Sequence, residues 1–451
     1  MAAQYDPSDG VGQLTELMRA DRTDRVDDTP PPVDRVARRR RRRRRAITTA
    51  AVFLVVAATV GGYVGWALNA PVGAPTASTS LPDPAPGPAA AIALPPDGVS
   101  AIEVSGGDDY FGPDAAATLW PAVGGDDPRP IASITKLITA LVILDKKPLA
   151  ASEAGPTLTF DKADHALYDK YYVLGASIAA MPTGSSMSQH DALEMMLVVS
   201  ACNYAEAVAE WAFGSQDAFL SATKRWLAAN GLTHTRIVES SGIDPRNTST
   251  PSDLIALGKI AMANPVVAEI ARLPRLDVPG HTGGNTNTLL GTAGVVGLKT
   301  GTLEATGANL LYSARLEVRI GHPLEITGVV LGGFSRDTVD RDVTALLSSI
   351  SDGFHTVRVG GKGDVVGTYS TPWGASAQLV LASDSTVYTW SDTPITATMT
   401  TTDVKSGRSG EVVGSVTYTA GDSTDTVQLV LDADIEPPDA WWRLTHPTQL
   451  G

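Results

Sequence analysis

A run of 23 residues without a charged side chain, residues 46–68, is a prominent hydrophobic signal in the 451-residue chain. A helix of that length crosses a hydrocarbon core about 30 Å thick. Eight consecutive arginines, residues 38–45, come directly before the run. Basic residues beside an apolar span stay on the cytoplasmic side of the membrane. The pattern therefore predicts one transmembrane helix, with residues 1–45 as a cytoplasmic, disordered, arginine-rich segment and the rest of the chain outside.

Two other interpretations of this N-terminal region stay open. A cleaved signal peptide also carries an apolar core, but such cores have about 7–15 residues, fewer than the run found here. An arginine run can also bind nucleic acid or direct a protein to the nucleus. Because the arginines stand directly against the apolar run, an uncleaved, single-pass anchor is the preferred interpretation.

The hydrophobic pattern divides the chain after the anchor into three further parts. Residues 69–97 are rich in Pro, Ala and small polar residues, which predicts an extended linker. Residues 98–355 combine helical periodicity, as in KLITALVILD and HDALEMMLVV, with buried-strand patterns such as LEITGVVLGGF. Residues 356–451 carry alternating segments such as VGSVTYTAG and DTVQLVLDADI between turn residues, which predicts a small all-β domain.

Charge and cysteine content narrow the possible functions. The chain has a net charge of −14, and its acidic groups are concentrated after residue 45, where 41 acidic side chains outnumber 23 basic ones. Binding of nucleic acid needs a net basic face, so no nucleic-acid partner is expected. One cysteine, Cys202, cannot form an intrachain disulfide or a cysteine-based zinc cluster.

The segment SITK is the first one with chemical content, because it places Ser133 and Lys136 three residues apart in a helical pattern that follows Pro130. Residues at this spacing share one face of a helix, so the amine would lie beside the hydroxyl. A serine hydroxyl becomes a nucleophile when a nearby base takes its proton, and a lysine can be that base. Chance also produces this spacing often, and a helix-capping serine with a solvated lysine is the structural alternative.

The segment KTGT, Lys299 to Thr302, follows the apolar run AGVVGL and is expected at the edge of a sheet. Lys299 and the hydroxyls of Thr300 and Thr302 can bind a carboxylate. Gly301 would let the backbone of a ligand approach closely. A lysine at a strand end is usually just solvated, so this segment is also weak evidence by itself.

The order of three motifs carries more weight than any one of them. S-x-x-K at Ser133, a serine-centred motif at Ser200 and K-T-G at Lys299 resemble the motifs of the serine penicillin-recognising enzymes. Within that group, the segments VESSGID, TSTPSDLIALGKIA and NTNTLLG are similar to the low-molecular-mass D-alanyl-D-alanine carboxypeptidases. The resemblance covers about residues 98–355. It implies an α/β (α+β) fold of the β-lactamase and transpeptidase type, with an antiparallel sheet flanked by helices, followed by a second, β domain.

The resemblance also implies a role for each matching residue. Ser133 resembles the acylated nucleophile and Lys136 its general base, and Ser200 looks like the relay that passes a proton to the leaving amine. Lys299 would bind the terminal carboxylate of D-Ala-D-Ala, with Thr300 orienting it. The backbone N–H groups of Ser133 and Thr302 would form the oxyanion hole.

Cys202 departs from the family pattern, because the third residue of the second motif is usually asparagine. Either Cys202 replaces that asparagine, or a local shift lets Asn203 serve in its place; replacement is the preferred interpretation. A thiol is only a weak donor and acceptor, whereas an asparagine amide offers both strongly. Replacement would therefore weaken a contact to Lys136 and leaves hydrolysis versus transpeptidation open. Cys202 could also be a small packing residue or, with an unidentified histidine, a nucleophile.

The implied function is a serine-type carboxypeptidase that acts on peptidoglycan stem peptides ending in D-Ala-D-Ala, releases D-alanine and is inhibited by β-lactams. Alternatives are a DD-transpeptidase, a wall-binding or regulatory protein with a decayed site, and a class A β-lactamase. The last needs a deacylating glutamate, for which Glu239 is the candidate in the right interval. Neither a metal-ligand spacing nor a glycine-rich phosphate loop is found, so no cofactor is expected.

Overall fold

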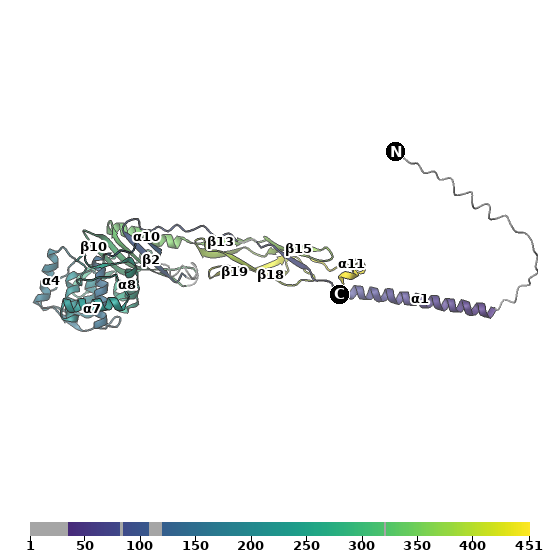
Figure 1. Ribbon diagram of the computed structural model, residues 1–451, viewed down its shortest axis with the longest axis horizontal. Helices are drawn as coiled ribbons and strands as arrows, with labels where there is room; N and C mark the ends of the chain where they lie inside the picture. The colour runs from purple at the N-terminus through teal and green to yellow at the C-terminus, as the bar shows by residue number, and fades with distance from the viewer. Residues whose placement is uncertain (1–34, 82–83, 108–119, 320–321) are drawn as a thin grey trace, which may run out of the picture. The chain divides into compact units, whose positions relative to one another are not determined.

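The computed structural model describes residues 35–81, 84–107, 120–319 and 322–451 (Figure 1). The described residues divide into two compact units. One unit contains the long N-terminal helix, up to Gly73, together with Pro438–Gly451 at the other end of the chain. The second unit is Ala74–Pro437, which holds the strands and the helices that lie between them in the chain.

The N-terminal helix α1, Arg35–Asn69, includes both the arginine run and the apolar run. Arginine has a high helix propensity, which explains why the helix begins well before the apolar residues. Val36–Asn69 is long and apolar enough to cross a membrane.

A short helix near the C-terminus, α11 (Ala440–Thr445), packs against the end of α1. Arg443 Nη1 donates hydrogen bonds to the carbonyl oxygens of Ala70 at 2.8 Å and Ala67 at 3.4 Å. These contacts satisfy carbonyl groups that the last turn of a helix leaves unpaired. The segment 356–451, expected to be a small all-β domain, thus ends in a short helix. Asp439 starts α11 because its side chain accepts a hydrogen bond from the Trp442 N–H group.

An antiparallel five-stranded sheet, called here the central sheet, organises the second unit. The strand order is β10 (Val295–Leu303), β11 (Gly307–Leu316), β12 (Leu324–Gly333), β2 (Val99–Ser105) and β3 (Trp120–Val123). Adjacent strand residues such as Leu310 and Leu311 belong to two different hydrophobic clusters, since successive side chains point to opposite faces. The antiparallel sheet flanked by helices is thus confirmed, with β10 at one edge.

One face of the central sheet packs on a group of helices and the other on a single helix, α10 (Arg336–Asp352). The residues of α3 from Thr135 to Leu144 are all buried in the first group. The elements of this group are η1 (Ala132–Ile134), α3 (Thr135–Lys146), α4 (Lys162–Val173), α5 (Gln189–Leu197), α6 (Cys202–Phe213), α7 (Gln216–Ala229), α8 (Pro251–Ala263) and α9 (Pro265–Ala271). Three short strand pairs lie among these helices: β4 (Arg129–Pro130) with β7 (Thr248–Ser249), β5 (Thr157–Thr159) with β6 (Ser186–Ser188), and β8 (Arg275–Val278) with β9 (His281–Gly284).

A second antiparallel sheet, the C-terminal sheet, has six strands. Their order is β1 (Thr76–Thr79), β14 (Val365–Ser370), β15 (Ser376–Leu381), β19 (Ser423–Leu431), β18 (Val412–Ala420) and β17 (Thr396–Thr401), and β13 (Phe354–Gly360) pairs separately with β16 (Ser385–Trp390). The first strand comes from the segment expected to be a linker. Its four residues are exposed, and pairing at a sheet edge uses backbone groups rather than an apolar pattern, so no hydrophobic pattern marks this strand.

Candidate active site

The predicted pair of Ser133 and Lys136 lies where η1 runs into α3. Lys136 is completely buried, and its Nζ donates hydrogen bonds to three acceptors. These are Ser133 Oγ at 2.8 Å, the Ser241 carbonyl oxygen at 2.6 Å and Cys202 Sγ at 3.3 Å. A lysine nitrogen can form three such hydrogen bonds, either as an ammonium group with three donors or as a neutral amine that accepts one of them from a hydroxyl. The amine is therefore held in one place, next to the serine hydroxyl.

Two glycines let other segments approach the backbone of Ser133. A Cβ atom on Gly301 of β10 would lie 2.8 Å from the Ile131 carbonyl oxygen and 3.0 Å from the Ser133 nitrogen. A Cβ atom on Gly242 would lie 2.0 Å from the carbonyl oxygen of Ala132, and Gly242 has a φ of +86°. Gly301 was expected to make room for a ligand backbone. The close contact that it permits in the structure is with η1, which brings the K-T-G strand against the serine, and the approach of a ligand backbone stays a prediction.

The second motif supplies Ser200 and Cys202 at the start of α6. Ser200 is buried, with a φ of +63° that is unfavourable for any residue with a side chain. Such strained residues cluster at functional sites. The side chain of Asn203 forms hydrogen bonds with the backbone N–H and carbonyl groups of Ala179, at 3.1 and 2.8 Å. The structure therefore brings Cys202, and not Asn203, to Lys136.

Lys299 lies in β10 and is almost completely buried, with its Nζ donating a hydrogen bond to Thr286 Oγ1 at 3.1 Å. Burial lowers the pKa of Lys299 well below its usual range, and the positive charges of Lys136 and Arg336 lower it further. Thr300 Oγ1 donates to the same Thr286 hydroxyl at 2.7 Å. Thr286 was not predicted as a site residue, although it lies in the segment NTNTLLG that carried part of the family resemblance.

Arg336 is a second residue that the sequence did not single out. It begins α10, and its Nε donates a hydrogen bond to Thr302 Oγ1 at 2.9 Å, where Thr302 is exposed. Lys299 and Arg336 thus place two cationic groups near one end of β10. A carboxylate is the natural ligand for such a pair. Arg336 lies 37 residues after Lys299, outside every motif, so no sequence pattern marked it.

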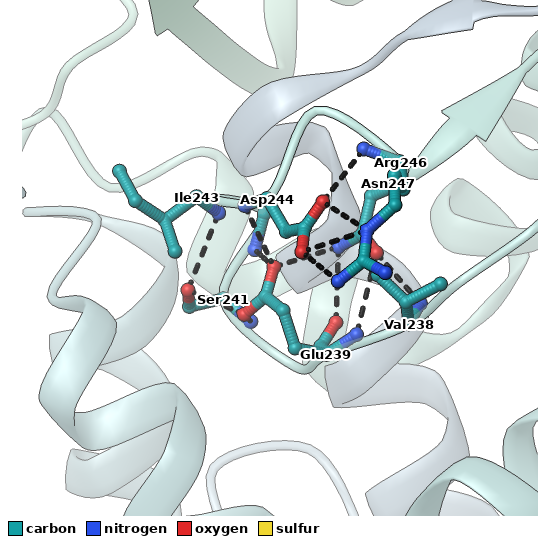
Figure 2. A network of polar contacts seen from close by, with 8 residues as sticks. Val238, Glu239, Ser241, Ile243, Asp244, Arg246 and Asn247 are labelled. Atoms are coloured by element: carbon teal, nitrogen blue, oxygen red, sulfur yellow. Dashed lines mark hydrogen bonds and ion pairs between the residues drawn. The ribbon is translucent and has the colours of Figure 1, made fainter.

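Glu239 was the candidate deacylating glutamate of the β-lactamase alternative. Its two carboxylate oxygens accept hydrogen bonds from Ser241 N–H and O–H, Gly242 N–H and Asn247 Nδ2, at 2.6 to 2.8 Å (Figure 2). A carboxylate with these contacts is occupied by its own loop. This geometry does not favour a role as base toward a water molecule.

The described residues contain one group with ligand atoms close enough to hold a metal ion, namely His190, Asp191 and Glu194 of α5. His190 Nδ1 is already 3.1 Å from Glu194 Oε1.

The Ser133 site consists of hydroxyl, amine and thiol groups. Its arrangement, a nucleophile beside a buried amine with two cations nearby, suits acyl transfer to serine on a substrate that ends in a carboxylate.

Comparison with known proteins agrees with this chemistry. A sequence profile described as D-alanyl-D-alanine carboxypeptidase matches residues 122–334. A D-alanyl-D-alanine endopeptidase of Pseudomonas aeruginosa is 30% identical over 225 residues, which are 48% of this chain and 68% of that protein. D-alanyl-D-alanine carboxypeptidase DacB2 of Mycobacterium tuberculosis is 28% identical over 221 residues, which are 45% of this chain and 72% of that protein.

The fold is also found among solved structures. Penicillin binding protein 6B from Escherichia coli matches with a TM-score of 0.51 at 21% identity, over 78% of this chain and 97% of that one. Fold, motifs and relatives together define a serine peptidase of the penicillin-binding type. The chain belongs to the D-alanyl-D-alanine carboxypeptidase family, as the resemblance of its motifs predicted.

Proposed function

We propose that the protein is a carboxypeptidase that removes the terminal D-alanine from peptidoglycan stem peptides ending in D-Ala-D-Ala, and that β-lactams inhibit it by acylating the same serine. The contact between Lys136 Nζ and Ser133 Oγ, 2.8 Å long and buried on the lysine side, carries the proposal. The name of the relative from Mycobacterium tuberculosis, a D-alanyl-D-alanine carboxypeptidase, is consistent with it.

The proposed reaction uses the side chains of the three motifs. Lys136, as the neutral amine, takes the proton of Ser133 while Oγ attacks the carbonyl carbon of the penultimate D-alanine. The C–N bond breaks, and the departing D-alanine leaves with a proton that Ser200 relays to its nitrogen. Water then attacks the ester on Ser133, releases the shortened peptide and restores the serine. Proton transfer of this kind contributes about 10²- to 10⁴-fold to the rate.

The terminal carboxylate of the substrate would lie at the end of β10. Lys299 and Arg336 supply positive charge there, and the hydroxyls of Thr300 and Thr302 lie on the same strand. Backbone N–H groups of Ser133 and Thr302 would stabilise the oxyanion, which is the largest single contribution in many acyl-transfer enzymes.

The cellular setting is also part of the proposal. We place α1 across the membrane, residues 1–45 in the cytoplasm and the active site outside, facing the wall. The eight arginines beside the apolar run support this orientation. Residues 98–355 would form the catalytic domain and residues 356–451 a C-terminal β domain, with a linker of residues 69–97 that contributes β1 to the C-terminal sheet.

Endopeptidase activity is a second candidate, because the relative from Pseudomonas aeruginosa carries that name. Both reactions cleave a bond after a D-alanine and use the same serine. They differ in whether the leaving amine is free D-alanine or the side-chain amine of a cross-linked peptide.

The test uses the full-length chain in detergent, with a Ser133→Ala variant beside it. Wild type should become labelled by a fluorescent penicillin, the variant should not, and wild type should release D-alanine from a pentapeptide ending in D-Ala-D-Ala. Release of monomers from a cross-linked dimer, without release of D-alanine from the pentapeptide, would identify the endopeptidase instead. Failure of wild type to bind penicillin or cleave either peptide would refute both.

A further inference from the structure

The loop from Val238 to Asn247 forms a dense polar network (Figure 2), and the Ser241 carbonyl oxygen in this loop accepts a hydrogen bond from Lys136 Nζ. Glu239 is its centre. One carboxylate oxygen accepts hydrogen bonds from the N–H and O–H groups of Ser241, both at 2.6 Å. The other accepts from Gly242 N–H at 2.6 Å and from Asn247 Nδ2 at 2.8 Å.

A single peptide group joins Glu239 to Lys136. In the peptide between Ser241 and Gly242, the N–H group donates to Glu239 and the carbonyl oxygen accepts from Lys136 Nζ at 2.6 Å. The N–H and C=O groups of a trans peptide point in opposite directions, so fixing one end aims the other. Hydrogen bonds in a chain also polarise one another, which makes this carbonyl a stronger acceptor when a carboxylate holds its N–H.

The network is also fastened to the segment that carries the nucleophile. Asn247 is completely buried, and its Nδ2 donates to Thr135 Oγ1 at 3.2 Å. The carbonyl oxygen of Asn247 accepts from Ile131 N–H at 3.0 Å. Asn247 therefore connects Glu239 to both sides of Ser133, and the backbone of Gly242, with no room for a Cβ atom, closes the arrangement.

We infer that Glu239 is a positioning residue for acylation: its carboxylate holds the Ser241–Gly242 peptide so that the carbonyl oxygen aims at Lys136 and keeps the amine beside Ser133 Oγ. The inference rests on the proposed function, since it assigns Glu239 a part in the same reaction. No hydrogen bond joins Glu239 to Ser133 or Lys136 among the described residues, so it acts through the Ser241–Gly242 peptide group, and Asn247 fastens it to the segment around Ser133.

Glu239→Gln is the main test, because glutamine keeps the size of the side chain and one acceptor but turns an amide NH₂ toward donors. The limiting rate constant and the half-saturating concentration for acylation by a fluorescent penicillin are measured on the full-length chain. The rate constant should fall about 10- to 100-fold, as expected for displacement of a catalytic group by a fraction of an ångström to 1 Å. The half-saturating penicillin concentration should stay within a factor of about 2, since Glu239 is not among the residues proposed to bind the penicillin.

Two further variants sharpen the result. Asp244→Asn, in the same loop, removes an equal charge from a carboxylate that binds Arg246, and should leave the rate unchanged. Ser241→Ala removes the hydrogen bond from the Ser241 hydroxyl to Glu239 but keeps the peptide group. Its acylation rate constant should lie between those of wild type and Glu239→Gln. This variant tests the inference if Glu239→Gln does not fold.

The outcomes separate three cases. Failure of wild type to acylate refutes the proposed function itself. A Glu239→Gln protein that acylates at the rate of wild type overturns the positioning role. A smaller labelled fraction that reacts at an unchanged rate also overturns it, because that result means that Glu239 only stabilises the fold.

Discussion

The two sheets of the second unit bury different kinds of side chain. In the described residues, four charged side chains are buried, and all lie around the central sheet: Lys136, Glu206, Asp253 and Lys299. The buried polar residues around the C-terminal sheet are small hydroxyl side chains of serine and threonine. Its core consists of residues such as Val416 and Leu429, which alternate with partly buried or exposed positions along each strand.

The difference shows which part of the molecule buries charged groups at a cost in the free energy of unfolding. Burial of an ammonium group costs free energy unless acceptors replace the lost water. Lys136 has three acceptors, whereas Lys299 has one hydroxyl acceptor among the contacts described above. Among the described residues of the C-terminal sheet, no buried ammonium or carboxylate group carries such a cost.

The largest expected effect comes from removal of the buried amine at the centre of the site. Lys136→Ala should lower the acylation rate constant by about 10²- to 10⁴-fold, because Ser133 would lose the group proposed as its general base. The loss is measured as the rate of labelling by fluorescent penicillin. Circular dichroism serves as the control for folding. Labelling at more than a tenth of the wild-type rate would show that another group takes the proton.

A smaller side chain in the core of the C-terminal sheet should lower stability without changing the acylation rate. Leu429 is fully buried in β19, and Leu429→Ala should lower the free energy of unfolding of that sheet by about 2–5 kcal/mol. The acylation rate at 25 °C should not change. Gln428→Ala, at the exposed neighbouring position, should change stability by less than about 0.5 kcal/mol. A fall in acylation rate in Leu429→Ala would mean that the two sheets are coupled.

Replacement of Lys299, which has one hydroxyl acceptor, by an apolar residue should raise stability and lower activity. The pKa of Lys299 is lowered in the folded state, so the unfolded chain binds more protons between that pKa and 10.5, and this group adds stability as the pH rises through that window. Lys299→Met removes the group. The variant should therefore have the higher melting temperature at pH 7, and its advantage should shrink toward pH 10.

Peptide cleavage by Lys299→Met is expected to be weak, since the substrate carboxylate loses a cation. A melting temperature below that of wild type at pH 7 would mean that the lysine has partners that offset its burial. An advantage that does not depend on pH would point to packing rather than charge.

The smallest effect should come from the contact that departs from the family pattern. Cys202→Ala removes a thiol 3.3 Å from Lys136, but a thiol is a weak acceptor and Lys136 keeps Ser133 Oγ and the Ser241 carbonyl. The acylation rate should fall less than about threefold. Cys202→Asn, measured alongside, reports what the usual amide would add. A tenfold loss in Cys202→Ala would give the thiol an essential part in holding the amine.

Local patterns predicted the parts of the site that depend on spacing within one element. Ser133 and Lys136 are brought together by one turn of helix, and the K-T-G segment forms an edge strand because its apolar run already favours a strand. The antiparallel sheet with flanking helices followed from the order of the motifs and the resemblance that they carry. These features need little information from distant residues.

The remaining contacts are made by residues that no local pattern distinguishes. Thr286 and Arg336 reach β10 from other segments, and a threonine or arginine in a loop or at a helix start is ordinary in sequence. Whether Cys202 or Asn203 faces Lys136 depends on how α6 begins against the segment around Ala179. Tertiary packing decides that choice, so the sequence alone left both alternatives open.

The contact between the residues that follow α1 and the C-terminal residues has a consequence for proteolysis. Gly451 N–H donates to the Pro71 carbonyl oxygen at 2.9 Å, and Val72 pairs with Leu450. The 364 residues of the second unit are therefore connected at both of their ends to segments that belong to the unit of the long helix. After a single cut by a protease in the segment that follows Gly73, the second unit would still be joined to residues 438–451, which pack on the end of the long helix. We expect one cut to separate the second unit from the helix only where these non-covalent contacts also break.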